Sequence, residues 1–151
     1  MTPCRVIPNI GEMKKRIRGI GGIFFKSRNS KALGAWYRKH FGFPVEAWGG
    51  CSFHWREAEN PRKKGHTVWN PFPGDTKYFA PSRRAFMLNF RVDDLDAVLT
   101  ALRAEGVRVL PGVEESEFGR FGWIIDPEGT KLEIWEPPAA RRVRRKRRSG
   151  T

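Results

Sequence analysis

The carboxylate of Glu133 is the side chain of this sequence with the clearest capacity for chemistry. It lies in the run 131–135, whose alternation predicts a β-strand. Glu133 and Trp135 share one face of that strand, and the aliphatic residues that alternate with them point the other way. A carboxylate held there is a ligand or an acid/base group if its face lines a cavity, and an ordinary surface residue if its face meets water. The pattern leaves both interpretations open.

Three other groups of potentially reactive side chains are weaker candidates for a functional site. The lone His40 is expected to end a helix with its hydrogen bonds satisfied rather than to bind a metal. The glutamates of residues 114–117 are consecutive loop carboxylates, for which we expect solvation. Cys4 and Cys51 are the only cysteines, too few for a disulfide framework, so we expect reduced thiols in a cytoplasmic protein.

The sequence also contains an internal repeat. Residues 66–72 align with residues 132–138 at a spacing of 66 residues, and both segments hold a Trp-x-Pro pattern. A strand-like run precedes each of two predicted helices, and the glycines that end those helices, Gly42 and Gly106, are 64 residues apart. We therefore predict two tandem units, each of a strand, a helix and two or three further strands.

Local signals place the remaining elements around Glu133. Its strand follows a turn at 126–129, where Pro fixes φ and Gly is free to adopt a positive φ. Residues 70–82 combine Pro, Gly and three aromatics, which is typical of an ordered loop over a binding site. Helices are predicted after the capping residues 27–30 and 93–94. Further strands are predicted over 20–26, 51–56, 66–69, 86–92, 107–110 and 121–125.

Composition bounds the classes of protein. The chain has 151 residues, of which 39% are hydrophobic, so it can build one core. It has no apolar run long enough for a transmembrane helix and no signal peptide is apparent. The net charge of +13 is concentrated in residues 1–18 and 141–148, and the body between them is nearly neutral. Residues 141–148 are expected to be a solvated tail, with nucleic-acid binding through phosphates as the alternative.

Three segments together resemble a known family. They are residues 33–42, residues 92–97 and residues 119–137, the last with an Asp-Pro-x-Gly-x-x-x-Glu pattern that ends at Glu133. This combination is similar to the vicinal oxygen chelate superfamily, which holds glyoxalase I, bleomycin-resistance proteins, extradiol dioxygenases and fosfomycin-resistance transferases. The resemblance covers about residues 17–138.

The resemblance implies an α+β fold of two tandem βαβββ modules that form a curved, cup-like mixed sheet, the glyoxalase/bleomycin resistance fold. It also implies a homodimer with cavities inside the cups. The expected organisation is a flexible basic N-terminal extension (1–18), a glyoxalase-like domain (19–138, with modules at about 19–72 and 86–138 joined by a linker loop at about 70–85), and a disordered basic tail (139–151).

The family's metal site has lost most of its ligands in this sequence. In metal-dependent members, four strand positions supply the ligands, and Glu133 matches the last of them. The other three correspond to Gly22, Thr67 and Met87, none of which is a usual ligand. His66 is next to Thr67, but a shift of one residue turns it to the opposite face. We therefore predict no family-type metal site and no cofactor, with a divalent metal held by rearranged ligands as the alternative.

What remains is a cup lined by aromatic side chains, with Glu133 as a candidate general base. The leading hypothesis is a protein that binds a small organic molecule, as bleomycin-resistance proteins do. The alternatives are a lyase, isomerase or dioxygenase-type enzyme that uses Glu133 as base or metal ligand, and nucleic-acid interaction through the basic tail. The predicted ligand-binding residues are Phe24, Trp69, Tyr78, Asn89, Arg120, Trp123, Glu133 and Trp135.

Overall fold

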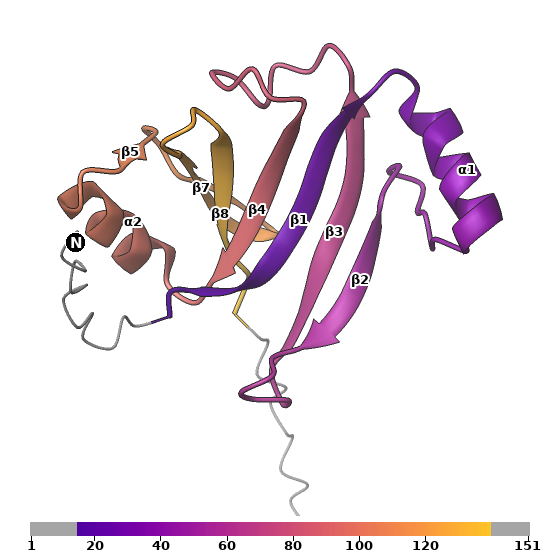
Figure 1. The fold of residues 1–151 in the computed structure, drawn as a ribbon. Coiled ribbons are helices and arrows are strands. Elements are labelled where there is room, and N and C mark those ends of the chain that lie inside the picture. Colours follow the sequence, from indigo (N-terminus) through magenta and orange to yellow (C-terminus); the bar gives the residue numbers. More distant parts are fainter. Residues whose placement is uncertain (1–14, 140–151) are drawn as a thin grey trace, which may run out of the picture.

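A computed structural model describes residues 15–139, which form one eight-stranded mixed sheet and two helices (Figure 1). The strand order is β2-β3-β1-β4-β8-β7-β5, and β6 pairs with β7. The predicted α+β fold is therefore confirmed, while predictions for 1–14 and 140–151 lie outside the described residues. The elements are β1 (Ile17–Ser27), α1 (Ser30–Phe41), β2 (Cys51–Arg56), β3 (Lys64–Pro73), β4 (Phe86–Val92), α2 (Leu95–Ala104), β5 (Arg108–Val109), β6 (Glu114–Ser116), β7 (Gly119–Ile125) and β8 (Lys131–Glu136).

The sheet repeats the same arrangement on both sides of its centre. β1 and β4 are antiparallel neighbours in the middle of the sheet. β3 joins β1 in parallel and β8 joins β4 in parallel, each after a connection that contains a helix. β2 and β7 then add antiparallel strands outside β3 and β8. The repeat seen in the sequence is thus also a repeat in space.

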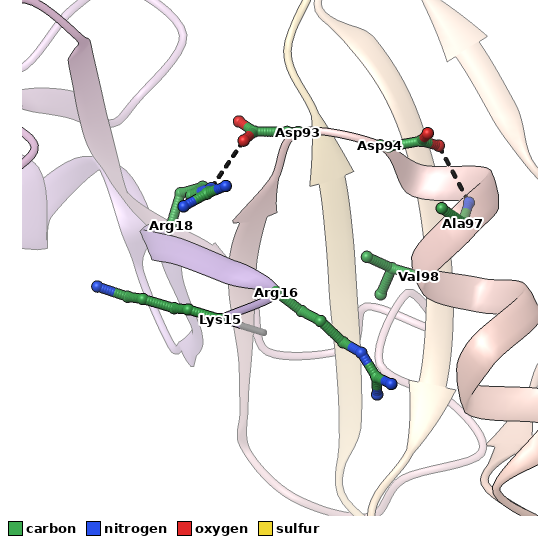
Figure 2. A pocket seen from close by; sticks show the side chains of 7 residues that line it. All are labelled: Lys15, Arg16, Arg18, Asp93, Asp94, Ala97 and Val98. Carbon is green, nitrogen blue, oxygen red and sulfur yellow. Dashed lines mark hydrogen bonds and ion pairs between the residues drawn. The ribbon is translucent and has the colours of Figure 1, made fainter. Parts of the chain in front are cut away.

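Two helix caps follow the capping signals of the sequence. The side chain of Asn29 accepts a hydrogen bond from the backbone N–H of Ala32, and Gly42 ends α1 in the left-handed conformation, with φ of 66°. At α2 the side chain of Asp94 accepts from the N–H of Ala97 at 3.0 Å (Figure 2). Within residues 15–139, neither helix combines the length and the apolar character that a membrane span requires.

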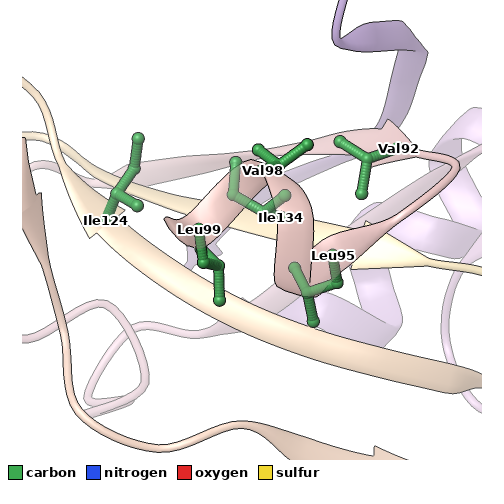
Figure 3. Packing of buried hydrophobic residues seen from close by; sticks show 6 residues of the cluster. All are labelled: Val92, Leu95, Val98, Leu99, Ile124 and Ile134. Carbon is green, nitrogen blue, oxygen red and sulfur yellow. The ribbon is translucent and has the colours of Figure 1, made fainter. Parts of the chain in front are cut away.

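α2 covers one face of the sheet. Its apolar side buries Leu95, Val98 and Leu99 against strand residues of β4, β7 and β8 (Figure 3). Those strand residues are Val92, Ile124 and Ile134. Because side chains alternate along a strand, Glu133 of β8 points away from α2. We call the face on which Glu133 lies the inner face.

β3 is longer than its sequence predicted. The run 70–73 reads Asn-Pro-Phe-Pro, which indicated a loop, yet it continues β3 beside β1 as far as the pair Ser27 and Pro73. The pairing with β2 stops at Trp69, so beyond that residue β3 is an edge strand. Proline lacks the N–H that an inner strand needs but is tolerated at such an edge. The glutamate-rich segment also forms a strand, the exposed β6.

Candidate functional site

The buried carboxylate of Glu133 is the centre of the inner face. Its side chain is 3% exposed and accepts three hydrogen bonds. Asn89 Nδ2 donates to Oε1 at 2.7 Å, Trp123 Nε1 donates to Oε2 at 3.0 Å, and the Tyr78 hydroxyl donates to Oε2. The donors come from β4, from β7 and from the segment between β3 and β4, so the tertiary fold assembles this group.

Strand register explains why two of these donors meet the carboxylate. Glu133 is the partner of Asn89 in the parallel pair β4–β8 and of Trp123 in the antiparallel pair β7–β8. Residues directly opposite each other in neighbouring strands bring their side chains together on the same face. Each strand neighbour of Glu133 therefore supplies one N–H group.

The third donor, Tyr78, is fixed by contacts of its own. Its ring stacks on Phe72 with centroids 5.6 Å apart and an interplanar angle of 7°. The Lys131 ammonium donates to the backbone oxygen of Tyr78 at 2.7 Å and lies 5.1 Å from the centre of its ring. As a result the segment between β3 and β4 covers Glu133.

Burial dominates the electrostatics of this group. Desolvation raises the pKa of Glu133, and the three hydrogen bonds together with Lys131 oppose that shift. Desolvation and the nearby carboxylate raise the pKa of Tyr78, so its hydroxyl stays protonated and can donate. Burial also lowers the pKa of Lys131. The protonated form of Glu133 is therefore favoured relative to a free glutamate, and the three donors reduce the cost of ionising it.

This donor set does not fit the divalent metal that the superfamily resemblance implies. In residues 15–139 no three His, Cys, Asp or Glu side chains come together as metal ligands do. The groups beside Glu133 turn a hydroxyl hydrogen, an amide N–H and an indole N–H toward the carboxylate. The one further oxygen, Asn89 Oδ1, packs against Gly21, whereas a divalent ion needs lone pairs from about three side chains. We therefore derive no chemistry through a metal.

Of the three degenerate ligand positions, two lie near Glu133 and one does not. Gly22 is opposite Asn89 in the β1–β4 pair, and Met87 is fully buried on the inner face. Thr67 instead bonds away from the site, donating to the backbone oxygen of Ile20 and accepting from Trp55 Nε1. This corrects the expected direction of Thr67.

The predicted direction of Thr67 was wrong because the alignment of the two repeats was in error by one residue in β3. β1 pairs Gly22 with Val68, and Val68 packs against the buried cluster of the inner face, so Val68 and not Thr67 shares the face of Glu133. His66 shares the face of Val68, and its ring contacts that of Trp135 at 5.2 Å. His66 therefore lies on the inner face, contrary to expectation.

The same alignment error affects Trp69, which points away from Glu133. Its ring packs 4.9 Å from Tyr37 of α1 and 5.2 Å from Phe43, on the opposite side of β3 from His66. The expected inward direction of Trp69 is therefore corrected.

Arg120 also points away from Glu133. It alternates with Phe121 along β7 and donates to both oxygens of Asp96 on α2, at 2.9 and 3.0 Å. Its guanidinium therefore lies on the α2 side of the sheet, and its expected place in the cup is corrected.

The remaining predicted residues do come together. Tyr78, Asn89 and Trp123 contact Glu133 directly, as described above. Phe24 packs in the adjacent buried cluster, and Trp135 stacks on Phe121 at 8° while its Nε1 donates to Phe118 O at 2.7 Å. Sequence reasoning did not include Lys131 among the site residues, although its alternation with Glu133 places it on the same face.

Asn89 carries an unpaired acceptor. The residue is 2% exposed, and its Oδ1 has no hydrogen-bond partner within the described residues. Its amide orientation is fixed because Nδ2 donates to Glu133. Oδ1 faces Gly21, where a Cβ would lie 2.2 Å from that oxygen and 2.9 Å from the Trp135 ring. A buried acceptor without a donor costs about 1–3 kcal/mol.

Comparison with known proteins identifies the class. A family model described as a glyoxalase-like domain matches residues 22–135, and the chain belongs to this family, within the vicinal oxygen chelate superfamily. No curated protein matches the chain significantly.

Solved structures share the fold. Methylmalonyl-CoA epimerase from Mycobacterium tuberculosis is 20% identical with a TM-score of 0.54, over 83% of this chain and 92% of that one. A variant of the Streptomyces coelicolor epimerase in complex with 2-nitronate-propionyl-CoA is 22% identical with a TM-score of 0.59, over 82% and 97%. An NAD-dependent benzaldehyde dehydrogenase from Legionella pneumophila is 14% identical with a TM-score of 0.52, over 78% and 98%.

Proposed function

We propose that the protein binds a small organic molecule on the inner face, beside Glu133 and Asn89, without a divalent metal. The observation that carries this proposal is the unpaired Oδ1 of Asn89, buried next to a buried carboxylate. A ligand N–H or O–H group that reaches this oxygen supplies the missing hydrogen bond, which an apolar ligand cannot do.

The surroundings support an organic ligand. The rings of Phe24, Trp123 and Trp135 are at least nine-tenths buried on the inner face. Apolar walls with a few convergent polar groups are typical of small-molecule sites, and flat aromatic walls favour planar ligands. One neighbour of the same fold is described in complex with a CoA ester, an organic ligand.

A calorimetric screen tests the proposal. Small aromatic amides, alcohols and amines are titrated into the full chain, with and without EDTA. We expect saturable binding that EDTA does not change and that Asn89→Ala weakens by about tenfold, the worth of one hydrogen bond to a polar group. The control is Asn60→Ala, in the exposed turn between β2 and β3. Binding that needs a metal, or that Asn89→Ala leaves intact, contradicts the proposal.

A second candidate is an isomerase or lyase with Glu133 as general base. The specific observation in its favour is the pKa of Glu133, which burial raises toward the range of a useful base. Several neighbours are described as methylmalonyl-CoA epimerases, so methylmalonyl-CoA in D₂O is the first probe. Exchange of its α-proton that Glu133→Gln abolishes supports this candidate, and its absence leaves binding without turnover.

The proposal includes a homodimer, as the superfamily resemblance implies. Trp36 and Phe41 of α1 are 48% and 65% exposed, and exposed aromatic side chains of this kind are frequent at protein interfaces. Sedimentation velocity of the wild type and of Phe41→Ser tests the proposed homodimer. A monomeric wild type contradicts it.

A further inference from the structure

Five basic side chains, three of Arg or Lys and two of His, gather on the inner side of the β2, β3 and β4 region. In residues 15–139, no ion pair includes any of them. Arg56 donates only to a backbone oxygen, that of Pro61, at 3.0 Å. We call these residues the cationic cluster: His54, Arg56, Lys64, His66 and Arg91.

Direct contacts join the cluster to the site around Asn89. His54 is opposite His66 in the β2–β3 pair, with ring centroids 5.8 Å apart. His66 meets the edge of Trp135, and the Arg91 guanidinium lies 5.9 Å from the centre of that same ring. Both Asn89 Oδ1 and the Trp135 ring pack against Gly21, where a Cβ would clash with each of them. Trp135 thus connects the unpaired acceptor to the cluster.

The outer part of the cluster borders a cavity of about 320 Å³, a size that suits a small ligand. Its wall includes Trp55, whose Nε1 donates to Thr67 Oγ1 at 2.9 Å. Gly65 lies against that ring, since a Cβ there would be 2.3 Å from it. These two contacts hold the Trp55 ring in place on the wall of the cavity. It is lined by His54, Trp55, Arg56, Lys64 and Gly65.

A second cavity, beside α2, shows that basic side chains alone do not indicate an anion-binding site. Beside α2, Arg18 Nε donates to Asp93 at 2.7 Å (Figure 2). Arg16, which lines the same cavity, donates to Glu105 at 3.0 Å. Those guanidinium groups already have their counter-charges. The cationic cluster has none among the described residues.

Burial and the neighbouring basic groups disfavour the protonated form of His66. Burial, His54 and Arg91 lower the pKa of His66, and the facing groups on β2, β3 and β4 are all basic, while β8 brings the uncharged Trp135. An anion placed among them removes this repulsion.

We propose that the cationic cluster binds an anionic group, a carboxylate or a phosphate, of the same small molecule whose N–H or O–H group satisfies Asn89. The inference rests on the proposed function for the donor end of the ligand. It adds that the ligand is an organic anion lying across Trp135, with its charge beside His66 and Arg91.

Histidine NMR tests the anion subsite directly, because the chain has only three histidines. Inorganic phosphate and, separately, benzoate are titrated into the full chain across a pH series. We expect either anion to raise the pKa of His66, while the ring signals of His40 on α1 stay unmoved. The anion that binds with the higher affinity indicates whether the ligand carries a phosphate or a carboxylate. A uniform response of all three rings, or none, overturns the proposal.

Matched variants test whether the anion binds at the cationic cluster. Arg91→Gln is expected to weaken binding of the preferred anion by about tenfold, the worth of one charge-assisted hydrogen bond. Arg103→Gln, on the exposed side of α2, is the control and should not change it. His66→Gln is a second variant that leaves the guanidinium in place and should also weaken binding. Equal affinity in wild type, Arg91→Gln and His66→Gln overturns the proposal.

The two proposals fail in different ways. If phosphate or benzoate moves His66 but no organic compound depends on Asn89, the subsite stands and the proposed function fails. If organic compounds bind through Asn89 but neither anion moves His66, the proposed function stands and the subsite fails.

Discussion

Glu133 is a buried acid whose environment shifts its protonation. Because burial raises its folded-state pKa above the unfolded value of about 4.3, the folded state holds the proton more strongly. Its contribution to stability is therefore full below that value and is lost as pH rises through the folded pKa.

Glu133→Gln should remove this dependence. We expect the free energy of unfolding of the wild type to fall relative to the variant as pH rises from about 4 toward neutrality. Urea unfolding of both proteins at several pH values measures the difference. A difference that stays constant or moves the other way would falsify the raised pKa.

Trp123 holds Glu133 through its indole N–H. Trp123→Phe keeps an aromatic ring but leaves a buried carboxylate without one donor, so we expect a loss of about 1–3 kcal/mol in the free energy of unfolding. Trp48→Phe is the control, because the Trp48 N–H bonds to Glu46 in an exposed place and its loss should cost little. Urea unfolding compares the two variants, and equal losses would contradict the role of Trp123.

At this scale the sequence identified much of the site. Alternation correctly placed Glu133 and Trp135 on one face of their strand, opposite the aliphatic residues. It failed at Thr67 and Trp69 because an alignment in error by one residue reverses every side-chain direction in a strand. Only the register between β1 and β3, which no local pattern determines, settles which residues of β3 face inward.

At the scale of the elements, Gly42 ends α1 with a positive φ of 66°, and no heavy atom lies within 4 Å of the position that a Cβ would take there. The backbone conformation alone should therefore penalise a side chain. We expect Gly42→Ala to lower the free energy of unfolding by about 1–2 kcal/mol, and Gly42→Asn by less because Asn tolerates this conformation. Thermal and urea unfolding provide the measurement, and equal effects of Ala and Asn would count against the argument.

Helix limits were predictable because capping residues and helix-ending glycines act locally. The extent of β3 was not, since whether proline can be accommodated depends on which neighbouring strand has ended. Tyr78 was predicted as a residue of a loop that covers the site, but not as a donor to Glu133. Loops have no periodicity from which a direction could be read, so the bond to Glu133 required the fold.

At the scale of the whole molecule, the stability of the protein should not depend on a divalent metal. The donors around Glu133 do not form a metal site, so prolonged dialysis against EDTA is expected to leave the melting temperature unchanged. Differential scanning calorimetry before and after dialysis, with elemental analysis of both samples, checks this. A lower melting temperature accompanied by loss of one metal equivalent would refute it.

The two-unit architecture was visible in the sequence because both units repeat the same order of elements. The filling of the inner face was not visible, because Phe72 and Phe79 reach it from β3 and from the segment that follows. Side chains of the protein itself occupy much of the expected hollow.

The hydroxyl of Tyr78 has a consequence for selectivity. A guest that offers its own proton to Glu133 merely exchanges one donor for another, and gains little from that contact. Asn89 Oδ1 faces no such rival among the described residues. Discrimination between competing compounds should therefore arise one strand away from the acid, at the amide, where a hydrogen bond is still to be made.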